Sequence, residues 1–565
     1  MCLDADVIVI GAGGGGAVIA KELGEKGLSV LLLEAGPWYG NNKWPEPNKN
    51  PGALSSSSAA DLDKKILDDC FTDYEEDMND LVSGKFRWGP ADRNQKPWFR
   101  GIQQKGFIWQ NSGVGGTTLQ YLANSPRAYP SAVDQVWPIS YREMIPYYEK
   151  VEATLPVKPA PMTAKEELFF YGAKKAGWSL LTTQNVTTPG YRPQPNAILQ
   201  PDPEINNPAF DFNEPHLGCT LRGHCINGCK TGPSIETVAK RSTLVSYIPL
   251  ALKTGNVEIR PNTFVSKILT ENDPAGGVRA SGVKIRNTWT AETADIRAKV
   301  IVSAAGVIET PRLWLNSKLP ENPWVGKGLT NHWFDCITGV FDERVLNNLL
   351  GISEGLPYIG QTSGARFDYP GLGMLLAFGT SPGAYSTLLY GSSQSGYALF
   401  NPAAPSVFEG VLTGTALKEV MSEYSRTLSI AVIIGDEANH RNGISLDPVR
   451  LDVNGHVPIL TYKPSKKDYP KREYLTRIAA EILKKAGAKQ IIRTNMPPGV
   501  FIHMHSTMRI GYVTDTNCEA HQVKRLFIAD NSVLFNSLGG PNPTLTTQAL
   551  ATRTAEKIEN KYFSS

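Results

Sequence analysis

The sequence predicts a mixed α/β fold, and three observations lead to this prediction. The chain has 565 residues, enough for three or four average domains or for two large ones. Apolar residues make up 41% and charged residues 20%, with 52 Gly and 40 Pro, so the chain is globular and rich in loops. Its amino terminus alternates a strand pattern, a glycine turn, a helix pattern and a second strand pattern, which favours a parallel sheet covered by helices.

The charge balance and the cysteine content narrow the function classes. The chain carries 57 Lys and Arg against 54 Asp and Glu, a net charge of +3, which gives no electrostatic reason to expect a nucleic-acid partner. We therefore expect a small-molecule function. The seven cysteines cannot all pair with one another, which favours a reducing compartment or thiols with another role.

Neither a leader peptide nor a membrane span is expected. The first apolar run begins at Val7, and no basic segment with an apolar core and a cleavage site precedes it. Residues 369–408 carry no charge, but repeated prolines, Pro370 and Pro382 among them, interrupt this segment too often for a membrane helix. These patterns predict a cytoplasmic location and no membrane span.

The first element pair has the residues of a phosphate-binding turn. Residues 6–10 form a buried-strand pattern, and Gly11, Gly13 and Gly16 follow as G-x-G-x-x-G before a helix pattern over 17–26. The first glycine permits the tight turn, the second lets the backbone approach a pyrophosphate, and the third lets helix and strand pack closely. The amino end of the helix then offers amide donors to the phosphates.

The second strand ends in an acidic residue. Residues 28–33 form this strand pattern, and Glu34 follows at the distance where a carboxylate meets the ribose hydroxyls of an adenosine. A carboxylate there disfavours a 2′-phosphate, so NADP is not expected. The motif leaves NAD and FAD open, and a glycine-rich turn in an unrelated α/β unit is the alternative.

Further glycine turns lie far along the chain. Residues 109–118 contain Gly113, Gly115 and Gly116, followed by Thr117 and Thr118. A third strand pattern over 299–303 leads into Ala304-Ala305-Gly306 and a helix-like stretch. A chain that returns to one site with several glycine turns is expected to wrap a long cofactor.

These segments resemble the glucose-methanol-choline (GMC) family of FAD-dependent oxidoreductases. The residues that carry the resemblance are 7–36, 115–118, 137–139, 146–148, 305–311, 503–511, 526–530 and 540–546, so it covers nearly the whole chain. The sequence is most similar to the bacterial branch of gluconate, glucose and glycoside dehydrogenases, with pyranose and sterol oxidases more distant. The resemblance implies a Rossmann-like FAD/NAD(P)-binding domain, an interleaved substrate-binding domain with a large antiparallel sheet, and FAD as the cofactor.

The resemblance also assigns the chemistry. His503 matches the family's catalytic histidine, the base that takes the hydroxyl proton while a hydride passes to flavin N5. Asn542 matches the partner position, where an amide holds the substrate oxygen but cannot accept its proton. A structural role for His503 is the alternative. His505 would share a face with His503 in a regular strand and is the alternate base.

Several residues are assigned to FAD by the same resemblance. Asp530 is expected at the ribityl or diphosphate group, Pro543 and Thr544 at the pyrimidine end of the ring, and the Val265 backbone at the adenine. A helix cap or loop residue is the alternative for Asp530. Some relatives attach FAD through a histidine after the second glycine turn. Gln120 stands at that place, so we expect FAD to be non-covalent.

Three cysteines raise the question of whether the chain binds a metal cluster. Cys219, Cys225 and Cys229 lie in a glycine-rich stretch, compact enough for three thiolates to hold an iron-sulfur cluster. Some dehydrogenases of this branch carry such a cluster, whereas related members keep cysteines there without one. We expect no metal site, with loop thiols or a local disulfide instead. Zinc with the flanking His216 and His224 is a further alternative.

The family pattern predicts two interleaved domains. The FAD-binding domain takes residues 1–160, 236–320 and 495–565, and the substrate-binding domain takes 161–235 and 321–494. Within the second domain, strands are predicted over 335–344, 427–435 and 457–462, and a helix over 466–485.

The predicted function is oxidation of a CH-OH group of a sugar, glycoside or other alcohol to a carbonyl by an FAD-dependent dehydrogenase or oxidase. Electrons would pass to oxygen, a quinone or a redox partner protein. The main alternative is an FAD-containing lyase of the same family, without net redox chemistry. A subunit that uses the dinucleotide only structurally and an NAD-dependent enzyme are the other possibilities.

Overall fold

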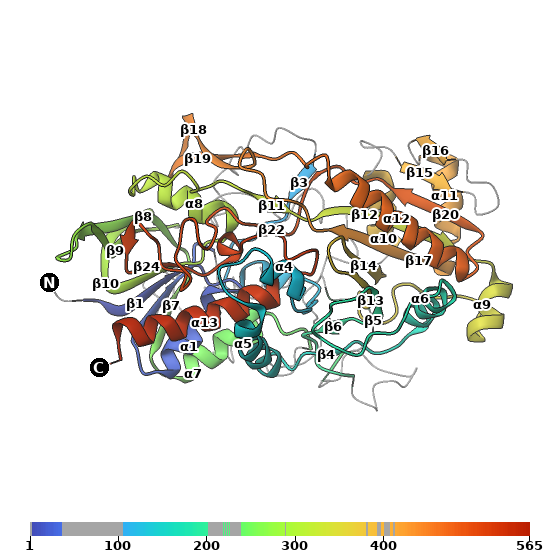
Figure 1. The fold of residues 1–565 in the computed structure, drawn as a ribbon, viewed down its shortest axis with the longest axis horizontal. Coiled ribbons are helices and arrows are strands. Elements are labelled where there is room, and N and C mark those ends of the chain that lie inside the picture. The colour runs from blue at the N-terminus through green and yellow to red at the C-terminus, as the bar shows by residue number, and fades with distance from the viewer. Residues whose placement is uncertain are drawn as a thin grey trace.

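The computed structural model is an elongated molecule with one large sheet at each end (Figure 1). Both chain termini lie at the end that holds the first sheet. The structure describes residues 3–36, 106–201, 218–219, 221, 223, 225, 239–288, 290–379, 382–391, 397–400, 407–410 and 413–564.

The first sheet has eight strands and a parallel centre. Its strands are β1 (Ala5–Ile10), β2 (Val30–Leu33), β7 (Val257–Arg260), β8 (Thr263–Asn272), β9 (Val278–Asn287), β10 (Thr293–Ser303), β23 (Val523–Lys524) and β24 (Leu526–Ile528). β1 lies between β2 and β10, and β2 also pairs with β7, all in parallel. Because both faces of these strands are covered, β1 and β2 are apolar along nearly their whole length rather than alternating.

Helices cover this sheet and begin at its carboxyl edge. They are α1 (Gly16–Glu25), α7 (Tyr247–Lys253), α8 (Gly306–Asn316) and α13 (Thr544–Tyr562), with α4 (Pro130–Asp134) and α5 (Tyr141–Thr154) packed outside them. α1 contacts α13 and α7, and α13 contacts α5. α5 begins at the cap Ser140, whose side chain accepts a hydrogen bond from the Glu143 amide. Two single turns, η2 (Gly116–Leu119) and η5 (Thr243–Val245), contact each other beside α7.

The second sheet is antiparallel and also has eight strands. They are β5 (Gly190–Pro193), β12 (Trp333–Val340), β13 (Ser363–Tyr369), β14 (Gly373–Phe378), β15 (Tyr397–Phe400), β16 (Val407–Gly410), β17 (Thr427–Ile434) and β20 (Gln490–Thr494). One face packs on α6 (Ala164–Lys175) and α12 (Asp468–Lys485) through an apolar cluster that includes Phe169, Phe367 and Ile482. α9 (Glu343–Leu350), α10 (Pro382–Gly391), α11 (Gly414–Ser422) and the turn η7 (Tyr424–Arg426) lie around it.

Four further strand pairs of the described residues lie outside the two large sheets. β3 (Gly106–Ile108) pairs with β21 (Gly499–Phe501), and β11 (Thr330–Asn331) pairs with β22 (Met504–His505). The remaining pairs are β18 (Gly443–Asp452) with β19 (Gly455–Thr461), and β4 (Lys158–Pro159) with β6 (Pro195–Asn196). β22 leads towards the short turn η8 (Asn531–Val533), with which it is in contact.

The predicted mixed α/β class is confirmed, with a sheet that has a parallel centre at one end and a large antiparallel sheet at the other. Among the helices of the described ranges, none combines the length and the apolar character that a bilayer crossing requires.

Candidate active site

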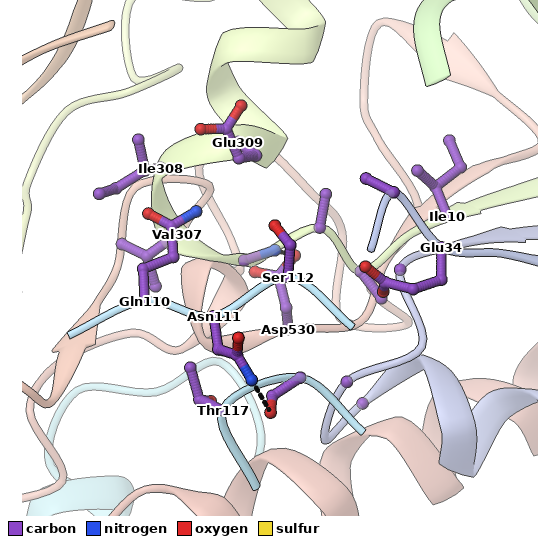
Figure 2. Close-up of a pocket in the computed structure, with 18 of the residues that line it drawn as sticks. Ile10, Glu34, Gln110, Asn111, Ser112, Thr117, Val307, Ile308, Glu309 and Asp530 are labelled. Carbon is purple, nitrogen blue, oxygen red and sulfur yellow. Dashed lines mark hydrogen bonds between the residues drawn. The ribbon is translucent and has the colours of Figure 1, made fainter. Parts of the chain in front are cut away.

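A cavity of about 220 Å³ opens at the carboxyl edge of the first sheet. It lies where β1, β2 and β10 end and where α1 and α8 begin, which is the position at which open α/β sheets bind their ligands. Figure 2 shows the side chains of Glu34, Asn111 and Asp530 around it. The segment 109–112 forms one wall, and its start is fixed by a hydrogen bond from the Trp109 amide to the Phe501 carbonyl at 2.8 Å.

Most of the residues that the sequence assigned to a cofactor line this cavity. They are Gly11, Gly13, Glu34, Gly116, Thr117, Thr118, Val265, Asp530 and Thr544. Gly16, Gly115 and Pro543 are not part of the lining, but each is next in the chain to a residue that is, namely Gly15, Gly116 or Thr544. Gly15 was not singled out by the sequence. The motif G-x-G-x-x-G does not specify the residue at position 15, so the turn was predicted only from the spacing of the neighbouring glycines.

The two glycine turns touch each other. A Cβ on Gly116 would lie 2.7 Å from the Cα atom of Gly13, and Gly116 has a φ of +52°. The Gly115 amide donates to the Ala12 carbonyl at 2.9 Å. Two segments about a hundred residues apart in the chain therefore form one continuous backbone surface, and a side chain on Gly116 would clash with the first turn.

Glu34 ties the same two turns together. Its buried carboxylate accepts hydrogen bonds from the amides of Ala12 at 2.9 Å, Gly36 at 2.8 Å and Gly113 at 3.1 Å. Burial raises the pKa of Glu34 above its ordinary value of 4.5, although these backbone donors oppose the rise. The carboxylate thus has a structural role in addition to its position on the cavity wall.

Asp530 has a similar double position. Its carboxylate caps η8 through the Ser532 amide at 2.7 Å and accepts from the Gly306 amide at 3.0 Å and the Thr310 hydroxyl at 2.6 Å. Burial raises the pKa of Asp530 above its ordinary value. The interpretation of Asp530 as a helix cap therefore accounts for its hydrogen bonds. Because Asp530 also lines the cavity, it would lie beside any ligand bound there.

The cavity suits an anionic dinucleotide. The amino ends of α1, α8 and α13 all contribute lining residues, and helix amino ends attract negative charge through their free amides and dipoles. The guanidinium of Arg312, which also lines the cavity, is bound to Asp452 at 2.8 Å and to Glu309 at 3.1 Å. Backbone amides rather than this arginine are thus available for phosphate.

Unpaired polar atoms in the lining also fit FAD. The side-chain oxygen of Gln110 and both amide atoms of Asn454 are buried and have no hydrogen-bond partner among the described residues. Since a buried polar atom without a partner costs stability, these groups are suited to a polar ligand such as the adenosine or ribityl part of FAD.

His503 lies beside the cavity, between β21 and β22. Its chain neighbours Ile502 and Met504 line the cavity. The Nε2 atom of His503 is 3.4 Å from Nδ2 of Asn542, so the structure brings the two predicted catalytic residues together across 39 positions of sequence. The Oδ1 atom of Asn542 is buried and has no partner among the described residues.

Two other histidines surround His503. Nδ1 of His332 is 2.9 Å from Nδ1 of His503, and the His332 Nε2 atom is 2.8 Å from the Ser537 carbonyl. His505 is fully buried behind His332, with ring centres 5.0 Å apart, and its Nδ1 is 3.4 Å from the Thr330 hydroxyl. Because His503 occupies a bend, the regular-strand premise for His505 as the alternate base does not hold.

Burial decides the protonation of this cluster. It lowers the pKa of His332 to about 4. Burial, together with the neighbouring His332, lowers the pKa of His503 and His505 well below 6.5. All three imidazoles are therefore neutral at pH 7, which is the state a proton acceptor needs. His332 was missed by the sequence analysis, because nothing in its local sequence distinguishes it from a core histidine.

The other predicted positions lie apart from this cluster. Gln120 is buried at the end of η2 and is not part of the cavity lining. Cys219 and Cys225 are buried, and their sulfur atoms accept the amides of Leu221 and Thr362, each at 3.4 Å. Cys229, His216 and His224 lie outside the described residues. Among the residues that are described, no three metal-binding side chains gather as a possible metal site.

Comparison with known proteins places this site in a family. Two family models, both described as GMC oxidoreductase, match residues 191–334 and 438–551. The 6′′′-hydroxyparomomycin C oxidase of Streptomyces lividus is 26% identical over 98% of this chain and 91% of its own. The 2-methyl-1,2-propanediol dehydrogenase of Mycolicibacterium austroafricanum is 25% identical over 99% of this chain and 95% of its own.

A solved structure shares the fold. The pyridoxine 4-oxidase from Mesorbium loti superimposes with a TM-score of 0.60 at 13% identity, covering 99% of this chain and all of the other. The two family models and the relatives aligned along nearly the entire sequence lead to one conclusion: this chain belongs to the GMC oxidoreductases, a family of FAD-binding enzymes that act on CH-OH groups.

Proposed function

We propose that this chain oxidises a CH-OH group to a carbonyl, with His503 as the base. The observation that carries the proposal is the pair of His503 Nε2 and Asn542 Nδ2, 3.4 Å apart beside the cavity. In the reaction, the hydroxyl proton goes to His503 and the two electrons of the C-H bond leave as a hydride. FAD bound in the cavity would supply the hydride acceptor at its N5 atom.

The two side chains would have different roles in this reaction. A neutral imidazole accepts the hydroxyl proton, and the Asn542 amide donates a hydrogen bond to the same oxygen as it becomes a carbonyl. His503 lies in the bend between β21 and β22, and Asn542 lies in the loop that precedes α13. The substrate oxygen would lie beside the two nitrogen atoms, within hydrogen-bond reach of both.

We further propose how FAD is held. The amides around Gly13 and Gly15 and the amino ends of α8 and α13 would face the diphosphate and the ring, and Val265 and Glu34 would lie by the adenosine. The linkage would be non-covalent, since the Gln120 amide cannot form one. In this proposal the FAD-binding domain comprises residues 1–160, 236–320 and 495–565, and residues 161–235 and 321–494 form the substrate-binding domain.

The names of two relatives support a proposal for the substrate class. These relatives are named for 6′′′-hydroxyparomomycin C and for 2-methyl-1,2-propanediol. We propose a sugar, glycoside or other alcohol as the reductant, with oxygen, a quinone or a redox protein as the electron acceptor.

An anaerobic titration tests this function. The purified holoprotein is mixed without oxygen with a panel of aminoglycosides, simple sugars, small diols and sterols, and the yellow absorption of oxidised flavin is followed. At least one alcohol should bleach the flavin and yield its carbonyl. If dithionite bleaches the flavin but no alcohol does, oxidation is wrong, and a family lyase without net redox chemistry takes its place.

A further inference from the structure

His332 is joined to the proposed base by both backbone and side chain. It follows β11 directly, and its amide donates to the His503 carbonyl at 3.1 Å, extending the β11–β22 ladder by one bond. Its imidazole is fully buried and lies edge-on to the ring of His503, with planes at 89°. The contact between the two rings is thus held in one orientation.

The hydrogen bonds of His332 determine where its proton lies. A backbone carbonyl only accepts hydrogen bonds, so the Nε2 atom of His332, at 2.8 Å from the Ser537 carbonyl, must carry the proton. A neutral imidazole has one ring proton, which leaves Nδ1 of His332 as an acceptor. The opposite tautomer would place two lone pairs against each other at 2.8 Å.

The same reasoning extends to His503. Its Nδ1 atom lies 2.9 Å from the Nδ1 acceptor of His332, so this atom of His503 carries the proton. The Nε2 atom is then the unprotonated one, and it is the atom that faces Nδ2 of Asn542. Ser537 and Asn542 belong to one loop, so the series of hydrogen bonds begins and ends on the same short segment.

We propose that His332 is a positioning residue that holds His503 in the tautomer whose basic Nε2 atom faces the substrate oxygen. This inference rests on the proposed function. After His503 has taken the substrate proton, both of its nitrogen atoms carry one, and Nδ1 still donates to His332. Because Nε2 of His332 faces only a carbonyl among the residues that the structure describes, a proton does not pass further along this series and leaves from Nε2 of His503, on the substrate side.

Two substitutions at one position test the proposal. His332→Leu removes both hydrogen bonds at similar size, whereas His332→Gln keeps an oxygen acceptor and an N–H donor on one side chain. We expect His332→Leu to slow anaerobic flavin reduction about 10²- to 10⁴-fold, the range for a misoriented acid-base group, with KM changed by less than about threefold. His332→Gln should stay within about tenfold of the original rate.

The pH profile separates positioning from packing. The neighbouring His332 lowers the pKa of His503, so its removal in His332→Leu should move the acidic limb of kcat/KM to higher pH. A rate for His332→Leu within twofold of the original, or equal losses in the Leu and Gln variants with an unmoved limb, would overturn the proposal. If no alcohol reduces the flavin of the unmodified enzyme, the proposed function fails instead.

A measurement on the unmodified holoprotein does not depend on any variant folding. The chain has eight histidines, and ¹⁵N labelling of their rings distinguishes protonated from unprotonated nitrogen atoms. The signals of His503 are identified by their absence in His503→Asn. We expect an unprotonated Nε2 and a protonated Nδ1 at pH 7. The reverse assignment contradicts the role of His332.

Discussion

At the scale of single residues, one imidazole nitrogen receives the proton in the proposed reaction. Replacing His503 with Ala should leave the flavin bound, because His503 is not part of the cavity lining. The rate of anaerobic flavin reduction by the best alcohol should fall about 10²- to 10⁴-fold. The exposed His521 offers a matched control, and His521→Ala should retain the original rate. An unchanged rate of flavin reduction in His503→Ala would show that His503 is not the base.

The pKa of the same residue predicts a pH dependence. Burial and the neighbouring His332 lower the pKa of His503 well below 6.5, so the unprotonated form persists when the pH falls below that value. We expect kcat/KM to decline only at a pH below 6.5, where Nε2 becomes protonated. A profile measured from pH 4 to 8 with a substrate that does not ionise checks this. A decline centred at or above 6.5 would contradict it.

Substitution of Glu34 should weaken FAD binding rather than slow the chemical step. Glu34→Ala leaves three buried backbone amides, those of Ala12, Gly36 and Gly113, without their acceptor. Each such loss costs about 1–3 kcal/mol, so FAD should be released during gel filtration and the unfolding temperature should fall. Glu258→Ala on β7 is the control, because that carboxylate is half-exposed and bonds only to Arg260 among the described contacts. Equal FAD retention in both variants would show that Glu34 does not hold the turns.

At the scale of elements, the first glycine turn has positions with different functions. A Cβ on Gly15 would lie 1.6 Å from the Ala529 carbonyl oxygen, whereas a Cβ on Gly13 would meet only Gly116 Cα at 3.8 Å. Gly15→Ala should therefore lower the unfolding temperature of the FAD-free protein. Gly13→Ala should leave that temperature unchanged and weaken FAD binding, because its methyl group adds to the cavity wall. Calorimetry without FAD and fluorescence titration with FAD measure the two effects. The reverse pattern would contradict this division.

Helices and strands with a strong local residue pattern could be predicted from the sequence, but the residues at which they end could not. The glycine turn after β1 and the helix after it follow from residues within one window. The predicted strand over 335–344 is wrong at its end, since β12 stops at Val340 and α9 begins at Glu343. Asp342 occupies the cap position of α9, and the three charged residues 342–344 belong to the start of this helix rather than to the strand.

Contacts between distant segments explain what the sequence left out. His332 has its place at the base only because β11 pairs with β22, which joins residues more than 170 positions apart. Similarly, Gly15 gains its importance from the Ala529 carbonyl, which no local pattern contains. His503 and Asn542 could be named beforehand because a family resemblance, rather than a local rule, connects them.

At the scale of the whole molecule, a buried polar contact joins the start of α4 to the second sheet. The Tyr129 hydroxyl, at the start of α4, donates to Asp368 on β13 at 2.8 Å, and Asp368 also binds Arg192 at 2.7 Å and Arg366. Burial alone would raise the pKa of Asp368, but the two arginines outweigh it and hold this pKa at about 2. A carboxyl whose pKa is lowered by folding stabilises the fold above its unfolded pKa and loses that contribution as the pH falls.

This contact predicts part of the acid sensitivity. The shift from 3.8 to about 2 corresponds to about 2 kcal/mol, present above about pH 4 and lost as the pH falls through 2. Urea unfolding of the original chain and of Asp368→Asn should therefore differ most at pH 7 and converge towards pH 2. Asp295→Asn, at a half-exposed pair with Lys284, is the control and should show no such trend. A pH-independent difference for Asp368→Asn would contradict the assignment.

The bonds of Glu34 have a consequence for the order of assembly. Because its carboxylate already holds Ala12 and Gly113, the two walls of the cavity are fixed by the chain itself. These segments therefore lose their conformational freedom when the chain folds. Little further conformational entropy is lost when FAD binds. The flavin should enter a site that is already formed, with an association rate that depends on its concentration and without a slow refolding phase.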